Sequence, residues 1–549
     1  MTLTHEQMAF PADRRFRLWI RPSMLLVFAL VAVGPVVAAW IQYLIAGLPP
    51  VSGDLDPAEG GPHGFPFFVR WGHYFNILFM VLIIRSGLSI LFDHPRLYWN
   101  VHCTPGSEWI RFTPLRVPTD RVWTANEDGR YLSPWIGLPG GKHGIGMARH
   151  WHFLSALFWL ANGLLFVILL FASGQWRRIL PTDWHILPEA WSVFIHYATF
   201  HMPPEPDGFY RYNSLQHLSY GAVVFLMAPL SILTGLAMSP AIDNHFPWYP
   251  RLFGNRQVAR SIHFLLLLGY LGFITVHVLM VVLSGLAQNM NHIVLGTDET
   301  GLPGAVLGGI GITVFILACY AAHWLSWHRP RVVQAAARSI VARLMGLFLD
   351  PLAPRAQHTR EEISPHFWPN GKMPASEEWT KLAADNFRDY RLRVHGLVDN
   401  PVELSLEQVK ALGKQEQITQ HHCIQGWTGI AEWGGVPLSK LLEMARPRPE
   451  ARWVVFHSFG EGLYGGEYYD CHSIDNLLHP QSILAFEMNY QPLNHVHGAP
   501  LRLRVENQLG YKMVKWVRSI ELVASVKEVG KGYGGRKEDD DYFDVIANI

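Results

Sequence analysis

The sequence predicts an all-α transmembrane helix bundle followed by a soluble α+β domain. Three observations lead to this prediction. The chain has 549 residues, which is too many for a single hydrophobic core. Six apolar stretches in its first 327 residues are long enough to cross a bilayer. The later part alternates short apolar runs with glycine and proline turns, a pattern that is typical of soluble mixed domains.

The composition agrees with a chain that lies partly in a membrane. Apolar residues make up 49% and charged residues 16% of the sequence, and the net charge is +1. A charge this close to neutral argues against a nucleic acid partner. The four cysteines are too scattered to form a disulfide framework, and Cys319 lies in an apolar stretch, where a thiol packs as a small hydrophobic group.

The predicted spans follow from length, because a helix needs about 20 residues to cross the hydrocarbon core. In lipid such segments must be helical, since only then are their backbone groups satisfied. The first stretch is too long for a signal peptide and five more follow it, so we expect a retained helix. The six stretches are residues 24–46, 67–92, 152–172, 218–238, 262–287 and 303–325.

Lysine and arginine in the connecting segments predict the orientation, because they concentrate on the cytoplasmic side. We call the side of the N-terminus Y and the opposite side X. Side X holds Arg70, Arg177, Arg178 and Arg211. Side Y holds eighteen such residues: Arg14, Arg15, Arg17, Arg21, Arg96, Arg111, Arg116, Arg121, Arg130, Lys142, Arg149, Arg251, Arg256, Arg260, Arg329, Arg331, Arg338 and Arg343. The bias predicts a multi-pass protein of the cell (inner) membrane, with the soluble domain on the cytoplasmic side.

Four histidines at the edges of the spans pair by depth. His263 and His277 lie 14 residues apart on one stretch, which places them about 21 Å apart and within about 40° of one helix face. His73 starts a span that enters from X, and His152 starts one that enters from Y. We therefore expect two haem b groups, one held by His73 and His277 and one by His152 and His263.

Other histidines leave alternatives open. Each single histidine fits a packing or interfacial role as well, and only the agreement of four depths favours haem. His150 competes with His152 as a ligand, His217 is a weaker candidate, and His323 has no obvious partner.

The same segments resemble a known family. Four motifs carry the resemblance: Arg70-Trp71-Gly72-His73, Leu215-Gln216-His217, Arg260-Ser261-Ile262-His263 and Thr275-Val276-His277. They are similar to the di-haem cytochrome b subunits of formate dehydrogenase and thiosulfate reductase. The resemblance covers about residues 66–287. It implies that one helix gives a ligand to each haem and that the haems exchange electrons with quinone. Pro229 and Gly235 predict a kinked helix within it. The Y-side loop 93–149 has no counterpart in the resemblance.

A linker and a soluble domain follow the predicted membrane domain of residues 1–327. Residues 332–349 predict a basic amphipathic helix on the membrane surface, with a solvated connector as the alternative. Pro351, Pro354, Pro365, Pro369 and Pro374 complete a linker over 328–385. We expect a soluble domain over 386–525 and a polar tail over 526–549. Its predicted strands are 391–397, 452–457, 501–505 and 517–523, and its predicted helices are 406–412 and 438–445.

Cys423 is the candidate chemical centre of the soluble domain. The thiol suits three roles: an inert core residue, a catalytic nucleophile with His421, His422 or His472 as its base, or a thiolate ligand of a soft metal. Cys471 does not complete a zinc-finger spacing. No GxGxxG or Walker sequence suggests a nucleotide cofactor. Spacing alone leaves the three roles open.

A second resemblance bears on this choice. It is carried by motifs that include His422-Cys423-Ile424-Gln425-Gly426-Trp427, Ala485-Phe486-Glu487-Met488-Asn489, His497-Gly498-Ala499-Pro500 and Gly510-Tyr511-Lys512-Met513-Val514-Lys515. These motifs are similar to the sulfite oxidase family. The resemblance covers about residues 360–525 and implies a Mo-molybdopterin cofactor with the catalytic Cys423 thiolate on molybdenum. By position it assigns the pterin contacts to Asn386, Arg388, His457, His497, Arg502, Lys512 and Lys515. Glu506-Asn507 stands where a proline is expected, and the short remainder after Glu521 resembles the minimal, methionine-sulfoxide-reductase-like branch.

The combined prediction is a membrane-bound molybdenum oxidoreductase. Electrons would pass between the quinone pool and a small S- or N-oxide or oxyanion through two b haems and the molybdenum centre. The expected partners are membrane lipid, quinone or quinol and this small substrate, and the sequence leaves the oligomeric state open. Two alternatives remain: a non-enzymatic cytochrome b electron conduit whose soluble half docks a redox partner, and a cysteine hydrolase on a membrane anchor.

Overall fold

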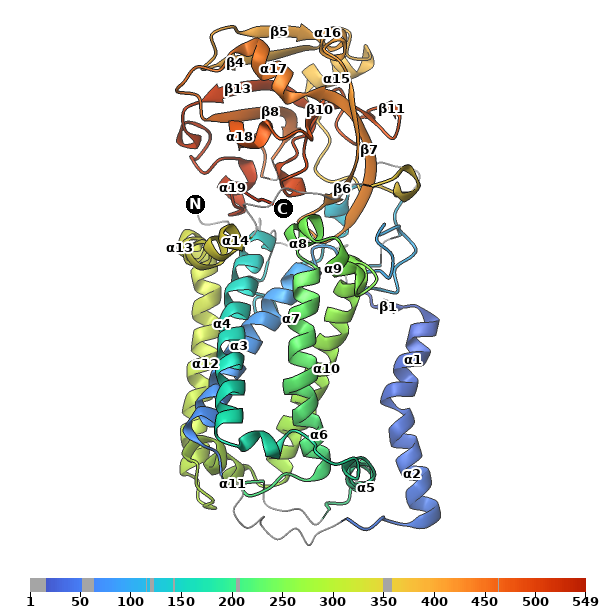
Figure 1. The fold of residues 1–549 in the computed structure, drawn as a ribbon, viewed down its shortest axis with the longest axis vertical. Coiled ribbons are helices and arrows are strands. Elements are labelled where there is room, and N and C mark those ends of the chain that lie inside the picture. The colour runs from blue at the N-terminus through green and yellow to red at the C-terminus, as the bar shows by residue number, and fades with distance from the viewer. Residues whose placement is uncertain are drawn as a thin grey trace.

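The computed structural model describes residues 16–51, 64–114, 116–118, 123–141, 144–203, 208–348, 358–462 and 464–549. Several residues named above lie outside the described ones: Arg14, Arg15, Arg121, Lys142, Pro351 and Pro354. A long helical bundle carries a mixed α/β domain at one end (Figure 1). Strand β1 and the C-terminus both lie at that end, as an even number of crossings requires.

Six helical segments of the described chain are long and apolar enough to cross a membrane, and all six were predicted. They are Pro22–Ala46, built from α1 (Pro22–Ala32) and α2 (Gly34–Ala46), then α3 (Phe67–Leu91), α4 (Ile145–Ala172), the segment Ser214–Ala237, α10 (Arg256–Leu283) and α12 (Pro303–His328). Two of the observed helices, α4 and α10, begin more than a turn before the predicted apolar stretch, on side Y. In α4 this extension adds His150 to the helix, next to His152, which already began the predicted stretch.

The span Ser214–Ala237 contains an interruption next to its proline. Helix α6 (Ser214–Ala222) continues through a π-helical turn, η4 (Val223–Met227), into α7 (Ala228–Ala237). Pro229 has no N–H to donate, and its ring would clash with the carbonyl one turn earlier in an ideal α-helix. The wider turn relieves this clash, as π-turns do at helix irregularities.

The Y-side loop between α3 and α4 is a folded cap. Strands β1 (Trp19–Ile20), β3 (Ile110–Arg111) and β2 (Arg96–Leu97) form a small antiparallel sheet in that order. The buried Arg96 guanidinium donates to Glu108 at 2.8 Å and to Asp128 at 2.5 Å. Because a buried charge needs partners, this triad holds the strands and turns of the cap together. The Trp109 indole then donates to Ser261 Oγ of α10 at 2.9 Å and so joins the cap to the bundle. The remaining elements between spans are η2 (Ala125–Glu127), η3 (Gln175–Arg178), α5 (Ile186–Ala198), α8 (Pro240–His245), α9 (Trp248–Arg251), α11 (Leu286–Met290) and η5 (Asn291–Leu295).

Two five-stranded sheets form the soluble domain. One has the order β11-β10-β7-β6, with β12 paired to β10, and the other has the order β5-β4-β13-β8-β9. Strand β13 pairs parallel with β4 and antiparallel with β8. The strands are β4 (Arg391–Gly396), β5 (Val402–Ser405), β6 (Gln415–His422), β7 (Thr428–Pro437), β8 (Trp453–Glu461), β9 (Glu467–Ser473), β10 (Ser482–Met488), β11 (Gln491–Pro492), β12 (Arg502–Val505) and β13 (Val517–Val523).

The helices of this domain are short and pack on the sheets. The main core includes Leu392, Val436, Leu441, Leu484 and Ile520, which come from both sheets and from α17. The helices are η7 (Arg360–Glu362), α15 (Glu377–Ala384), α16 (Leu406–Ala411), α17 (Leu438–Ala445), α18 (Ile474–Leu477), η8 (Gly510–Lys512), η9 (Val526–Glu528) and α19 (Arg536–Asp540). The predicted strand 517–523 and helix 438–445 have the observed bounds.

The C-terminal segment, predicted as a polar tail, is packed between the two halves. Glu538, Asp539 and Phe543 are buried. Gln334 donates to the carbonyls of Tyr542 and Phe543 at 3.2 and 2.8 Å. Gln334 belongs to the predicted amphipathic helix, which the structure builds as α13 (Pro330–Ala337), η6 (Arg338–Ala342) and α14 (Arg343–Phe348) across the end of α12 (Figure 1). The tail therefore links the soluble domain to the bundle.

Candidate functional site

The membrane bundle holds two pairs of histidines at different depths. His73 on α3 faces His277 on α10, with ring centres 6.3 Å apart. His152 on α4 faces His263 on α10, with ring centres 6.5 Å apart. Two imidazoles that bind one metal from opposite sides, each through a bond of about 2 Å, have ring centres about 6 Å apart. The structure thus brings the four residues together in the pairs expected from depth.

Hydrogen bonds leave the Nε2 atoms of two of these rings free to bind a metal. His152 Nδ1 lies 3.2 Å from the carbonyl of Ile83, which only accepts, so this nitrogen carries the proton. The Thr234 hydroxyl donates to the carbonyl of Leu230, so it accepts from His263 Nδ1 at 3.0 Å. Ligating histidines in metalloproteins are held in this way, with one nitrogen donating to the protein. The donor set therefore fits a bis-histidine haem.

The alternative histidines have other surroundings. His150 Nε2 lies 3.1 Å from the carbonyl of Tyr542 in the C-terminal segment. His323 packs against Trp327, with ring centres 6.2 Å apart. In the part of the chain that the structure describes, neither these two nor His217 makes a ring contact with another histidine. Of the two neighbours on α4, His152 is the one placed opposite His263.

Cys423 lies in a tight turn between β6 and β7. The Gly426 amide donates to the Cys423 carbonyl at 2.9 Å, and the Cys423 amide donates to the Trp427 carbonyl at 3.1 Å. Gly426 has φ +100°, which a side chain rarely tolerates, so glycine is required here. The turn holds the thiol inward, and the residue is 4% exposed.

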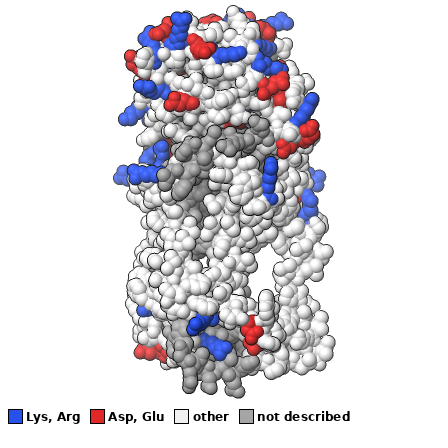
Figure 2. All heavy atoms as spheres, in the orientation of Figure 1, with Lys and Arg blue, Asp and Glu red and all other residues white. Residues whose placement is uncertain are grey.

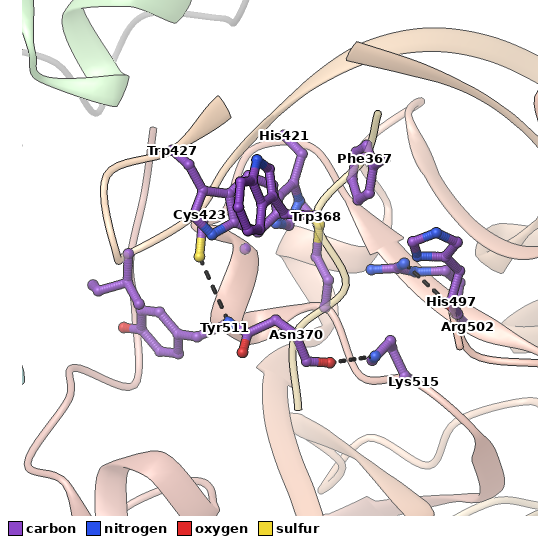
Figure 3. A pocket seen from close by; sticks show the side chains of 13 residues that line it. Phe367, Trp368, Asn370, His421, Cys423, Trp427, His497, Arg502, Tyr511 and Lys515 are labelled. Carbon is purple, nitrogen blue, oxygen red and sulfur yellow. Dashed lines mark hydrogen bonds between the residues drawn. The ribbon is translucent and has the colours of Figure 1, made fainter. Parts of the chain in front are cut away.

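A small cavity extends from Cys423 to a cluster of basic residues (Figure 3). Cys423 and Tyr511 lie toward one end of the view, and His497, Arg502 and Lys515 lie at the other. The lining residues are Phe367, Trp368, Asn370, His421, Cys423, Ile424, Trp427, His497, Arg502, Gly510, Tyr511, Met513 and Lys515. The cavity therefore connects a thiol with buried cations.

Among the described residues, the two cations of the basic end donate their hydrogen bonds to backbone carbonyls. Lys515 Nζ donates to the carbonyls of Asn370 and Val496, and Arg502 Nη1 donates to the carbonyl of His497 at 3.0 Å. Within the described residues neither cation has a salt bridge. Burial and mutual repulsion lower the pKa of Lys515, and burial and the neighbouring Arg504 lower the pKa of Arg502. An anion such as a phosphate would relieve both effects, so this end fits the phosphate of a molybdopterin.

The thiol end fits a metal ligand better than a nucleophile. Burial raises the pKa of Cys423 to about 12, so the free side chain is a neutral thiol. A nucleophilic cysteine needs a depressed pKa and a nearby base. The three histidines considered as bases do not hydrogen-bond to Sγ among the described contacts, and His472 is bonded to the carbonyl of Lys512. Binding of a metal cation would deprotonate the thiol.

Four of the predicted pterin contacts lie away from this cavity. Lys512 is fully buried and pairs with Asp470 and Glu538. His457 lies between Glu467 and Glu521, at 3.5 and 3.0 Å. Asn386 and Arg388 are exposed in the turn after α15. Of the predicted set, the structure brings together Cys423, His497, Arg502 and Lys515, and the other assignments stay predictions.

Sequence reasoning missed Asn370, which lies in the segment predicted as linker. Its side-chain amide donates to Cys423 Sγ at 3.7 Å and to Gln425 Oε1 at 3.3 Å. Phe367 and Trp368, just before it, are buried in the cavity wall. The sequence does indicate that this segment is buried, because two large aromatic residues followed by Pro-Asn-Gly are unusual in a solvated linker.

Comparisons with known proteins match the two halves separately. A family model described as prokaryotic cytochrome b561 matches residues 64–294, and one described as oxidoreductase molybdopterin binding domain matches residues 379–529. The membrane half is therefore similar to cytochrome b561, which confirms the fusion of a cytochrome b with a molybdopterin domain that the sequence predicts.

Curated relatives also match parts of the chain. "Putative protein-methionine-sulfoxide reductase subunit YedZ1" of Azospira oryzae is 29% identical over 35% of this chain and 66% of its own. "Uncharacterized oxidoreductase YuiH" of Bacillus subtilis is 34% identical over 28% of this chain and 70% of its own. "Protein-methionine-sulfoxide reductase catalytic subunit MsrP" of Xanthomonas axonopodis pv. citri is 30% identical over 25% of this chain. The chain spans 46% of that subunit's length.

Proposed function

The chain belongs to the sulfite oxidase family of molybdopterin oxidoreductases, fused to a cytochrome b561-type membrane domain, and from this premise we propose that it links quinone to an oxide substrate. In this proposal the two histidine pairs would hold two b haems, which would supply electron transfer across the bilayer, and Cys423 would hold a molybdenum centre. The substrate is a small S- or N-oxide or oxyanion. The names of the YedZ1 and MsrP relatives support a sulfoxide.

The observation that carries the proposal is the shared helix α10. It supplies His277 to one histidine pair and His263 to the other, and its Y end contacts the turn that holds Cys423. One rigid element thus joins both candidate haem sites to the candidate molybdenum site. A non-enzymatic conduit gives no reason for buried cations that face a buried thiol across a cavity.

The membrane half would hold the haems, and the soluble domain would hold the molybdenum cofactor. His73, His277, His152 and His263 would hold the haems, which supply one-electron transfer. Cys423 would hold the Mo-molybdopterin, which supplies oxygen-atom transfer, and His497, Arg502 and Lys515 would bind its pterin and phosphate. Asn370 would orient the sulfur through its amide. Reduction of a sulfoxide takes up two electrons and two protons and yields a sulfide and water.

We further propose that the soluble domain lies in the cytoplasm. The Lys and Arg bias toward side Y supports this orientation, and the soluble domain lies at the same end of the bundle as β1 (Figure 1). Figure 2 shows the blue and red side chains gathered at the two ends of the molecule, with a largely uncharged band between them. Such a band is the part of the surface that lipid would cover.

The test of the proposed function is analytical and then kinetic. Purified protein should contain molybdenum and two haem b groups, by metal analysis and by reduced-minus-oxidised spectra. A panel of S-oxides, N-oxides and sulfite, assayed with quinol or quinone analogues, should identify a substrate. Protein with haem but no molybdenum and no turnover would support the electron conduit instead.

A further inference from the structure

The first turn of α10 contacts the Cys423 turn directly. Arg256 Nη1 and Gln257 Nε2 both donate to the carbonyl of Gly426, each at 3.0 Å. The Gln257 amide also donates to Thr428 Oγ1 at 3.1 Å. Gln257 is fully buried, although it lies at the junction of the membrane bundle and the soluble domain.

The chemistry of its partners fixes the orientation of this amide. The Thr428 hydroxyl donates to the carbonyl of Val101 at 2.6 Å, so it accepts from Gln257. The Gly426 carbonyl also only accepts. Both partners therefore require the nitrogen of Gln257, and exchanging its oxygen and nitrogen would lose both bonds. Three segments meet at this amide: α10, the Y-side cap and the Cys423 turn.

The same helix carries a haem ligand close by. His263 follows Gln257 by six residues, a rise of about 9 Å along the helix axis. Between them, the Arg260 guanidinium donates to the carbonyls of His94 and Arg96 at 2.9 and 3.0 Å. It packs so closely on Gly426 that an added Cβ would lie 3.3 Å from its Cζ. A short covalent and hydrogen-bonded route therefore runs from His263 to Cys423.

We propose that Gln257 is a positioning residue that sets the contact through which electrons pass between the His152–His263 haem and the Cys423 molybdenum centre. This inference rests on the proposed function. The haems that the histidine pairs would hold would supply two electrons, and these electrons, with two protons, would reduce one sulfoxide to a sulfide and water. The electrons come from quinol. Gln257 takes part in no bond change, and its effect is on the placement of the Cys423 turn.

The variant Gln257→Met tests this role, because it keeps the length of the side chain and removes both hydrogen bonds. Gln42→Met is the matched control. Gln42 lies on α2, far from the soluble domain, and its Oε1 accepts a hydrogen bond from the Trp191 indole at 2.9 Å. Both variants should retain wild-type haem and molybdenum contents and should be reduced by quinol at the wild-type rate. In Gln257→Met, methionine sulfoxide should reoxidise the haems about tenfold more slowly, because misplaced redox partners react more slowly.

A second readout needs no turnover. Hydrogen exchange at the backbone amides of residues 426–428 should speed up in Gln257→Met and stay unchanged in Gln42→Met, since the turn loses two of its anchors. A wild-type rate of haem reoxidation in Gln257→Met would overturn the proposal. A loss of molybdenum that matches the fall in the rate of haem reoxidation would also overturn it. Gln257 would then be needed to form the molybdenum site and not to position it relative to the haem. A wild-type protein whose haems no oxide reoxidises would instead contradict the proposed function.

Discussion

His152 and His263 face each other across α4 and α10 with ring centres 6.5 Å apart. Both lie in the first third of their helices, and these helices begin at the end of the bundle that carries the soluble domain (Figure 1). Their Nδ1 atoms donate hydrogen bonds to the carbonyl of Ile83 and the hydroxyl of Thr234, respectively. This pair lies near Gln257 and the Cys423 turn, and the His73–His277 pair lies deeper toward side X. The two histidine pairs thus follow one another along α10, and the first turn of this helix contacts the Cys423 turn.

Removing histidines should remove haems in pairs. His73→Ala and His277→Ala should each lose one and the same haem, and His152→Ala and His263→Ala should each lose the other, because a low-spin haem needs both axial ligands. Reduced-minus-oxidised spectra of the four variants check this. His150→Ala is the control and should keep both haems, since its ring is bonded to Tyr542 instead. Loss of the His263 haem in His73→Ala would disprove the pairing.

The basic end of the cavity should determine how tightly molybdopterin is held. Lys515→Met should weaken binding by about tenfold to a hundredfold, because a charge-assisted hydrogen bond contributes about 1.5–3 kcal/mol. The molybdenum content after prolonged dialysis, relative to haem, measures this loss. The exposed Lys381, on α15, supplies the control Lys381→Met. Equal molybdenum retention in both variants would argue against an anion at this end.

His457 predicts a pH dependence of stability. Burial lowers its pKa, but hydrogen bonds to Glu467 and Glu521 outweigh this effect, so its pKa is raised. A raised pKa adds stability that is present below the unfolded value of about 6.5 and is lost as the pH rises through the folded value. Thermal unfolding of the soluble domain should therefore shift to lower temperature between pH 6 and pH 8.5. His457→Gln should show a smaller shift, and an equal shift would assign the pH dependence elsewhere.

A fusion experiment tests which side of the membrane the soluble domain faces. With side Y inside, a C-terminal green fluorescent protein should fluoresce and a C-terminal alkaline phosphatase should be inactive, because the phosphatase folds only after export. An immunoblot must show intact fusions in both cases. High phosphatase activity from an intact fusion would place side Y outside and reverse the orientation derived from the Lys and Arg bias.

Hydrophobic patterns predicted much of the fold, because they report which face of an element is buried. The six spans and the elements β13 and α17 followed from such patterns. Strands β6 and β7 did not. Strand β6 is polar in sequence, yet Gln417, Thr419 and His421 are buried, since Gln417 pairs with Glu506 and His421 with Arg504. Burial of this kind depends on partners that are distant in the sequence.

The candidate site was predicted in part for the same reason. Cys423 and the basic residues that line the cavity were recognised from their blocks. Lys512 belongs to the same block as Lys515, but Asp470 and Glu538, which lie 42 and 26 residues away in sequence, bind its ammonium. No local pattern shows that these two carboxylates reach it. Asn370 was not predicted because it lies in an apparent linker, and its contact with Cys423 forms between residues that are 53 positions apart in sequence.

The most direct measurement follows the haems of the Cys423→Ser variant through one reaction with substrate. Quinol should reduce both haems in the wild type and in the variant, because Cys423 lies apart from all four histidines. Adding methionine sulfoxide should reoxidise the wild-type haems and leave those of Cys423→Ser reduced, since in the proposed function this sulfur would hold the centre that accepts the oxygen atom. Cys319→Ser, in α12, should behave as the wild type. Haem reoxidation at the wild-type rate in Cys423→Ser would contradict a molybdenum centre at this residue.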